Sequence, residues 1–258
     1  MLDVDALLPE LERAFRGVRD IAREAFRAPP GRPGRKADGT VVTSLDHALE
    51  ARLSKTLLAL DRDWGVTGEE GGVLREGSPT WHLDALDGTL NFSRRLPMFV
   101  CQAALVDGAE PLIGIIYDPL RDVFAWCARG RGAWEEGSRL QVSRRPIEDA
   151  LLLVDVARSG AFVHRPELLP KLRRNVFRMR SFGCAGLHLL SVAAGRADAF
   201  YGARRRPSPL HDVAPGVLFI QEAGGLVTSG DGQPPLEDRR TILAAHHDLH
   251  GTLRTLVR

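Results

Sequence analysis

The chain has 258 residues, with 35 Lys and Arg against 33 Asp and Glu, which gives a formal net charge of +2. This net charge is too slight to argue for nucleic acid or an anionic membrane as a partner, so neither is expected. The three cysteines form no CxxC pair, which argues against a disulfide framework or a cysteine zinc site and favours a reducing compartment. The N-terminus is acidic, and no apolar run approaches the ~18 residues needed to cross a bilayer. We therefore expect a cytosolic protein.

Apolar residues in the N-terminal segment recur at steps of three and four, which predicts one long amphipathic helix from Leu7 to Phe26. The segment 29–40 is basic and rich in Pro and Gly, and we interpret it as a mobile loop. A second helix is expected from Ser44, which can cap it, to about Leu60. Short apolar segments then predict strands at residues 64–67, 81–83, 99–106, 112–117 and 123–128.

The second half of the chain alternates predicted strands with predicted helices. Layered α/β structure is therefore expected, and a soft boundary near residues 145–150 separates an N-terminal subdomain (1–148) from a C-terminal subdomain (149–258). The predicted strands are residues 151–156, 176–180, 198–201 and 241–245, and the predicted helices are 166–173, 185–194, 212–223 and a C-terminal helix.

Carboxylates lie where several predicted elements begin or end. Glu69 and Glu70 follow one strand, Asp84 and Asp87 follow another, and Asp212 begins a helix. Strand ends of this kind are where α/β folds build their sites. Carboxylates brought together repel unless they are protonated or bridged by cations, and oxygen ligands favour Mg²⁺, Mn²⁺ or Ca²⁺ over zinc. Taken singly each group is weak evidence, because Asp-Gly is a common turn and an acidic residue commonly begins a helix.

Order and context strengthen this evidence. The pattern Trp81-x-x-Asp84-x-x-Asp87-Gly88-Thr89-x-Asn91-Phe92 follows Gly-Glu-Glu and precedes Asp-x-Ala and Glu-Ala-Gly-Gly. Together with the segment from Lys36 to Asp46 and the run Gly183-Cys184-Ala185, it resembles the inositol monophosphatase family over nearly the whole chain. The resemblance implies a five-layer αβαβα sandwich and Mg²⁺-dependent hydrolysis of a small phosphorylated metabolite. It also implies two or three Mg²⁺ ions, with Mn²⁺ as a substitute, and suggests a homodimer.

The resemblance further implies roles for individual residues. Asp46, Glu69 and Thr89 would be catalytic, with Asp46 and Thr89 holding the attacking water. The implied metal ligands are Glu69, Asp84, the carbonyl of Leu86, Asp87 and Asp212, with Glu70 as the second choice for Glu69. The implied substrate-binding residues are Asp87, Gly88, Thr89, Cys184, Ala185 and Asp212.

One departure from the family concerns substrate recognition. Inositol-hydrolysing members carry a Glu directly after an aromatic pair, whereas here Tyr201 is followed by Gly202-Ala203-Arg204-Arg205-Arg206. The absent carboxylate argues against inositol 1-phosphate as the natural substrate. The arginines, with Arg205 as the chosen contact, could hold a second phosphate or a carboxylate, or form a solvated basic loop. His211 replaces the usual Trp and either contacts substrate or fills that space.

Several functions therefore remain open. Fructose 1,6-bisphosphate, histidinol phosphate, 3′-phosphoadenosine 5′-phosphate and NADP are alternative substrates. A member that binds a phosphorylated ligand without turnover is the alternative from another class, although the retained acidic residues argue against it. Covalent phosphatase routes lack their motifs, since no Asp-x-Asp precedes Gly-Thr and Cys184 has no arginine six residues later.

Overall fold

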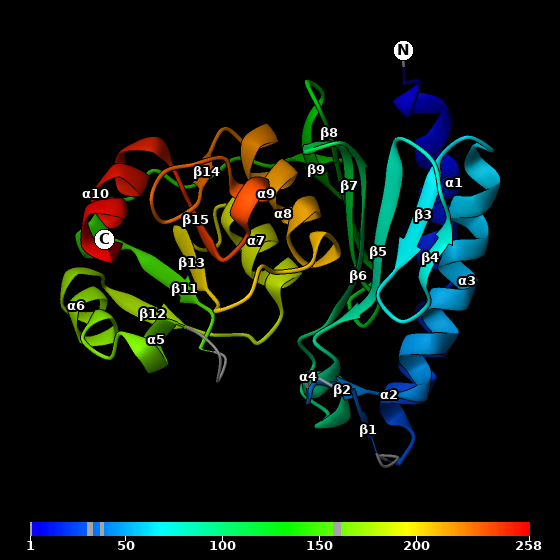
Figure 1. Ribbon diagram of the computed structural model, residues 1–258, viewed down its shortest axis with the longest axis horizontal. Coiled ribbons are helices and arrows are strands. Elements are labelled where there is room, and N and C mark those ends of the chain that lie inside the picture. Colours follow the sequence, from blue (N-terminus) through cyan, green and yellow to red (C-terminus); the bar gives the residue numbers. More distant parts are fainter. Residues whose placement is uncertain (1, 30–32, 37–38, 157–160) are drawn as a thin grey trace.

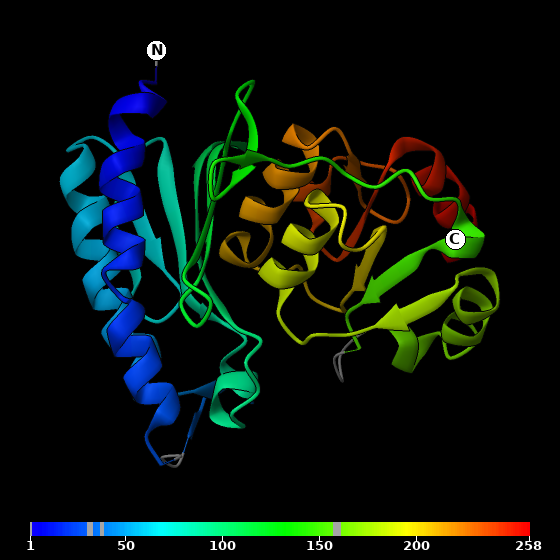
Figure 2. The same cartoon turned by 180° about the vertical axis from the view of Figure 1, so that it is seen from behind.

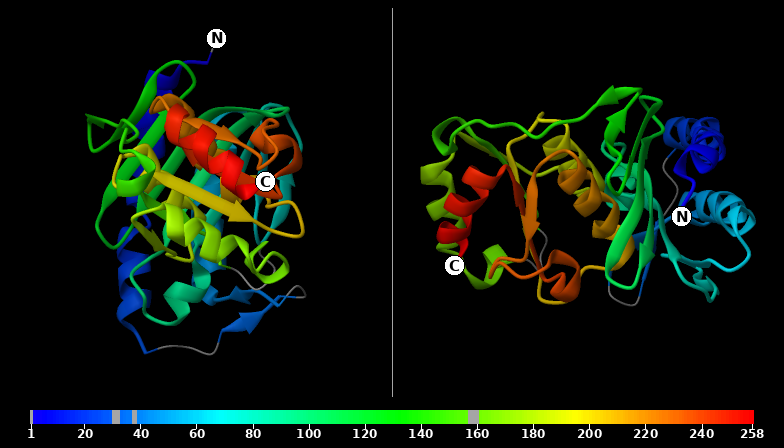
Figure 3. Two further views of the ribbon diagram at one scale, coloured as in Figure 1. Left: turned by 90° about the vertical axis from the view of Figure 1, so that its left-hand side faces the viewer. Right: turned by 90° about the horizontal axis from the view of Figure 1, so that it is seen from above.

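Helices and sheets alternate in five layers, as Figures 1 and 2 show from opposite sides and Figure 3 shows from above. This computed structural model describes residues 2–29, 33–36, 39–156 and 161–258. From one side of the molecule to the other, the layers are α1 to α3, an eight-stranded sheet, α7 and α8, a five-stranded sheet, and α5, α6 and α10. The predicted αβαβα sandwich is confirmed.

The first layer contains α1 (Val4–Arg16), α2 (Arg19–Arg27) and α3 (Ser44–Leu60). The prediction of a single N-terminal helix was wrong, because α1 ends at Gly17. The N–H of Gly17 donates the last hydrogen bond of α1, to the Arg13 carbonyl. The cap of α3 was also misplaced. Thr43, not Ser44, caps this helix, and its side chain accepts from the N–H of Leu45 while Asp46 accepts a bond from the Thr43 N–H.

The large sheet has the order β10-β9-β8-β7-β6-β5-β3-β4. Trp81 and Leu83 of β5 point toward α1 and α3, within a core that also contains Leu49 and Leu53. The opposite face packs against α7 and α8. The strands are β3 (Gly65–Gly68), β4 (Gly72–Arg75), β5 (Thr80–Asp87), β6 (Val100–Asp107), β7 (Glu110–Asp118), β8 (Val123–Ala128), β9 (Gly132–Glu135) and β10 (Ser138–Arg139).

An irregularity at the end of β5 determines where its acidic side chains point. Asp84 pairs with Gln102 of β6, and Asp87 pairs with Val100, so three steps along β5 match two along β6. Without this bulge, residues three apart on a strand would point to opposite faces of the sheet. The extra residue lets both carboxylates approach the side of the sheet that α8 covers. Helix α4 (Thr89–Ser93) follows directly.

The second sheet has the order β12-β11-β13-β15-β14, and its inner face shares a core with α7, α8 and the large sheet. Its outer face packs against α6 and α10. The strands are β11 (Leu151–Val154), β12 (Arg178–Arg180), β13 (Ala199–Ala203), β14 (Leu226–Thr228) and β15 (Thr241–Ala245). The helices are α5 (Ala161–His164), α6 (Leu168–Asn175), α7 (Ala185–Ala193), α8 (Leu210–Glu222), α9 (Pro235–Asp238) and α10 (His247–Val257), with a 3-10 turn at Ile147–Asp149.

The longer predicted elements occur in the structure with small shifts at their ends. In the segment 29–40 that was predicted as a loop, β1 (Gly34–Arg35) pairs with β2 (Val41–Val42), which follows the segment directly, whereas residues 30–32 and 37–38 lie outside the described residues. The chain passes from one sheet to the other between β10 and β11, and the division into two subdomains stays a prediction. Among the described residues, no helix is long and apolar enough to span a membrane.

Candidate active site

Asp84 and Asp87 share one hydrogen-bond donor, the side chain of Gln102. Its Nε2 lies 3.4 Å from Asp84 Oδ2, 3.3 Å from Asp87 Oδ2 and 3.4 Å from the backbone carbonyl oxygen of Asp212. Gln102 is fully buried, and its own Oε1 has no hydrogen-bond partner in the described part of the chain. The amide therefore ties the end of β5 to the first turn of α8.

Gln102 was missed by sequence reasoning, because a glutamine in an apolar strand belongs to no motif. The signal available was its position, one polar residue within the run Val100-Cys101-Gln102-Ala103-Ala104. Buried polar side chains are rare unless they are hydrogen-bonded, so a glutamine in this apolar strand indicates a polar partner nearby.

The same oxygen of Asp87 also accepts from donors at the start of α7. Gly186 N–H donates to Asp87 Oδ2 at 2.6 Å, and the Cys184 thiol lies 3.3 Å from this oxygen. A Cβ at position 186 would lie 2.7 Å from Gln102 Oε1, so this close approach requires glycine. Asp87 Oδ1 has no hydrogen-bond partner among the described residues and is available to a ligand. Ala185, the third predicted residue of this segment, is the first residue of α7.

Asp46 and Thr89 come together as the sequence predicts. Thr89 Oγ1 lies 2.8 Å from Asp46 Oδ1 and 3.0 Å from the Leu86 carbonyl oxygen. The other Asp46 oxygen accepts from the N–H and hydroxyl of Thr43 at 2.8 and 2.6 Å. Gly88, just before Thr89, has φ of 98°, and a Cβ there would lie 2.7 Å from the Met98 carbonyl oxygen. Only glycine suits this turn.

Glu69 and Glu70 both pair with Lys36, whose Nζ lies 2.6 Å from Glu69 Oε1 and 2.5 Å from Glu70 Oε1. The Glu69 charge raises the pKa of both Asp84 and Asp212, so this carboxylate lies near the two aspartates. The choice of Glu69 over Glu70 as the metal ligand stays a prediction. The paired lysine adds a positive charge at the edge of the carboxylate cluster, which comprises Glu69, Asp84, Asp87 and Asp212.

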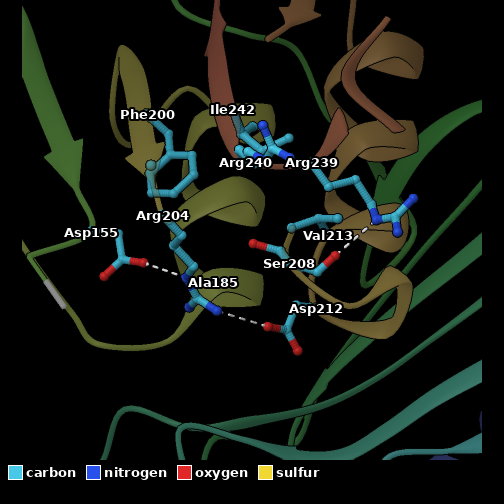
Figure 4. A pocket seen from close by; sticks show the side chains of 11 residues that line it. Asp155, Ala185, Phe200, Arg204, Ser208, Asp212, Val213, Arg239, Arg240 and Ile242 are labelled. Carbon is cyan, nitrogen blue, oxygen red and sulfur yellow. Dashed lines mark hydrogen bonds and ion pairs between the residues drawn. The ribbon is translucent and has the colours of Figure 1, made fainter. Parts of the chain in front are cut away.

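Asp212 lies in the first turn of α8 and has two cationic or polar neighbours. Arg204 Nη1 is 3.2 Å from Asp212 Oδ2, and His211 Nε2 is 3.4 Å from Asp212 Oδ1. Arg204 Nε also contacts Asp155 Oδ2 at 2.9 Å, as Figure 4 shows. Arg205, the arginine chosen from the sequence, is exposed, and in the described structure no hydrogen bond or ion pair holds it. His211 contacts Asp212 from a largely buried position.

Burial raises the pKa of each aspartate in the cluster. The pKa of Asp84 rises well above its ordinary value, because the side chain is buried and lies near Asp87, Glu69 and Asp212. Burial and the Asp212 charge raise the pKa of Asp87 to about 7. Burial also raises the pKa of Asp212, although His211 and Arg204 oppose that shift. Crowded carboxylates of this kind favour a compensating cation.

The donor set fits a hard divalent cation in charge and chemistry. The cluster offers carboxylate oxygens and the Leu86 carbonyl, the ligands that Mg²⁺, Mn²⁺ and Ca²⁺ prefer. In the described ranges, no three His, Cys, Asp or Glu side chains are placed to hold one ion together. Lys36 and Arg204 instead contact Glu69 and Asp212. A bound metal would replace Lys36 and Arg204 as the partner of these Glu69 and Asp212 oxygens.

Five alternating layers, with this carboxylate cluster at the end of β5, place the protein among layered α/β proteins with an acidic site between two sheets. The chain belongs to the inositol monophosphatase family, whose sequence profile matches residues 3–258. It is 34% identical to an inositol-1-monophosphatase of Caulobacter vibrioides, over 93% of this chain and 96% of that one. It is 30% identical to a fructose-1,6-bisphosphatase/inositol-1-monophosphatase of Thermotoga maritima, over 75% and 73% of the two chains.

A solved structure supports the same assignment. The extragenic suppressor protein SuhB of Bartonella henselae superposes with a TM-score of 0.90 at 26% identity, over 98% of both chains. Phosphatase activity on small phosphorylated substrates and a general dependence on metal follow at the level of the family.

Proposed function

We propose that this protein is a Mg²⁺-dependent hydrolase of small phosphate monoesters. The observation that carries the proposal is the buried carboxylate cluster, joined by Gln102 and lying beside the pair formed by Asp46 and Thr89. The cluster would hold two or three Mg²⁺ ions, and Mn²⁺ could replace them. Bound Mg²⁺ supplies a nucleophile at neutral pH and neutralises the charge of the ester.

The residues of the chain then have separate tasks. Glu69, Asp84, Asp87, Asp212 and the Leu86 carbonyl would hold the metal. Asp46 accepts the hydrogen bond of the Thr89 hydroxyl, which orients the attacking water and gives its proton a path to the carboxylate. The backbone N–H groups of Gly88 and Thr89 at the start of α4 would receive the phosphate oxygens, as helix N-termini do.

The proposal is tested by phosphate release from a panel of esters with Mg²⁺ or with EDTA. The panel contains inositol 1-phosphate, fructose 1,6-bisphosphate, histidinol phosphate, 3′-phosphoadenosine 5′-phosphate and NADP. Hydrolysis that appears with Mg²⁺ and disappears with EDTA is the expected result. If the folded protein releases no phosphate from any ester with ample Mg²⁺, this result would favour a family member that binds a phosphorylated ligand without turnover. A cytosolic location and a homodimer remain predictions beside this proposal.

A further inference from the structure

A pocket rich in arginine lies directly beside Asp212, on the side of the cluster toward the second sheet (Figure 4). It is lined by residues of β13, the starts of α7 and α8, the loop before α8 and the segment from Arg239 to Ile242, together with Asp155 after β11. Three guanidinium groups and two carboxylates line it. The polar residues that line it are Asp155, Arg204, Ser208, Asp212, Arg239 and Arg240.

Two of these arginines already have partners within the protein. Arg239 donates to the backbone carbonyls of Ser208 and Leu236 at 2.8 and 2.7 Å. Arg240 pairs with Asp238 at 3.3 Å, where both side chains are exposed. Arg239 therefore holds the loop, Arg240 forms an exposed ion pair, and Arg204 is the arginine of the pocket that contacts Asp212.

Arg204 is positioned to contact a ligand. Its Nε is anchored by Asp155 at 2.9 Å, its Nη1 lies 3.2 Å from Asp212, and its Nη2 has no partner in the described chain. Asp155 directly follows β11, which pairs in parallel with β13, so neighbouring strands fix the two side chains against each other. A metal that takes over Asp212 would also release Nη1, while Asp155 keeps the guanidinium in position.

We propose that Arg204 is a specificity-determining residue that binds a second anionic group of the substrate, a carboxylate or a second phosphate. Because the guanidinium contacts Asp212, this group must lie close to the ester that is hydrolysed, as on an adjacent carbon. A guanidinium carries donors and no acceptor, so it binds an oxyanion better than the hydroxyl of a neutral polyol. The inference rests on the proposed function and adds the substrate class to it.

A matched pair of esters tests the inference. 2-Phosphoglycerate and glycerol 2-phosphate carry phosphate on the same carbon and differ by a carboxylate in place of a hydroxymethyl group. The ratio of their kcat/KM values cancels changes in metal affinity or in the amount of folded enzyme. It is measured for the wild type, for Arg204→Gln and Arg205→Gln, and for Arg174→Gln on the distant helix α6.

The wild type and Arg174→Gln should favour 2-phosphoglycerate by about tenfold or more, as a hydrogen bond to a charged group allows. Arg204→Gln should bring the ratio close to one, mainly because the carboxylated ester binds less tightly and its KM rises. A wild type without this preference would overturn the inference. So would a preference that survives Arg204→Gln, or one that Arg205→Gln removes instead.

A binding measurement separates this inference from the proposed function. Both esters are titrated into Ca²⁺-loaded protein by calorimetry, with the wild type and Arg204→Gln side by side. If the carboxylated ester binds more tightly, and this depends on Arg204, while Mg²⁺ supports turnover of no ester, the hydrolase is refuted and the role of Arg204 stands. Equal binding of the two esters by the wild type would refute that role.

Discussion

At the scale of single residues, Gln102 shows how one buried amide can organise several carboxylates. Its side-chain NH2 group lies 3.3–3.4 Å from oxygens of Asp84 and Asp87 and from the Asp212 carbonyl oxygen, and these hydrogen bonds constrain which oxygens of the two aspartates remain for a metal. Groups that orient metal ligands commonly change metal affinity when they are replaced.

We predict that Gln102→Met, which keeps the volume and removes the donor, weakens Mg²⁺ binding by about 10–100-fold. The expected cause is that Asp84 and Asp87 lose their shared hydrogen bond and repel each other more freely. Calorimetric titration of the metal-free protein with Mg²⁺ gives the affinity, and far-UV circular dichroism checks the fold. An unchanged Mg²⁺ dissociation constant would show that Gln102 only fills space.

A second prediction concerns the hydroxyl of Thr89, which joins Asp46 to the Leu86 carbonyl. Thr89→Ala should lower kcat by about 100-fold or more, because the group that orients the water is lost. Thr89→Ser keeps the hydroxyl and should remain within about tenfold of the wild type. Steady-state kinetics on the best ester of the panel compare the two variants, and equal losses in both would assign Thr89 a purely structural role.

At the scale of elements, the capping box of α3 links folding to the site. Thr43 caps the helix and also donates its hydroxyl to Asp46. Thr43→Ala should therefore destabilise the protein by about 1 kcal/mol, as loss of a helix cap does. It should also lower kcat through Asp46. Urea denaturation measures the stability, steady-state kinetics measure kcat, and Thr43→Ser is the matched control. A loss of stability with unchanged kcat would show that Thr43 stabilises α3 without positioning Asp46 for catalysis.

The sequence predicted elements best where one physical signal dominates. Leu45, Leu49, Leu53 and Leu57 repeat every four residues and correctly predict α3, because one face of that helix is buried. The break at Gly17 was missed, since the apolar period continues across it. Short edge strands such as β4 carry little apolar pattern, because their side chains are exposed.

Within the site, the contiguous motif was the part most readily predicted from the sequence, whereas the roles of Asp46, Glu69 and Asp212 followed only from the family resemblance. The run from Asp84 to Thr89 is contiguous, and the structure brings it beside Asp212 and Asp46. The spacing of residues within a short segment does not predict contacts between distant segments. We predicted Arg205 from the sequence as the contact for a second anion. In the structure Arg204 points toward Asp212, because the orientation of each arginine depends on how β13 pairs with its neighbouring strands.

At the scale of the whole molecule, the carboxylate cluster lies between the two sheets and opposes folding when it is charged. The pKa of Asp87 is raised to about 7 from an ordinary value near 4, so the folded state binds more protons than the unfolded state between these values. The contribution of Asp87 to the stability of the metal-free protein therefore falls as pH rises through this range. A bound cation should reverse the effect, because it stabilises the charged form.

We therefore predict that, in EDTA, the melting temperature of the wild type falls relative to that of Asp87→Asn, which is neutral at every pH, between pH 5 and pH 8. Mg²⁺ should raise the wild-type melting temperature most at the upper end of this range. Differential scanning calorimetry with and without Mg²⁺ measures both trends. A difference between the two melting temperatures in EDTA that stays constant from pH 5 to pH 8 would contradict this interpretation of the cluster.

The most direct test of the central claim compares Mg²⁺ binding and phosphate release in the wild type and in Asp87→Asn. The substrate is the ester that the panel identifies, and calorimetry reports metal binding on the same preparations. We predict that hydrolysis by the wild type follows Mg²⁺ occupancy, and that Asp87→Asn loses metal affinity and at least about 100-fold in kcat, as removal of a transition-state contact does. Hydrolysis that persists in EDTA, or an Asp87→Asn variant that retains full activity, would contradict a metal-dependent site at this cluster.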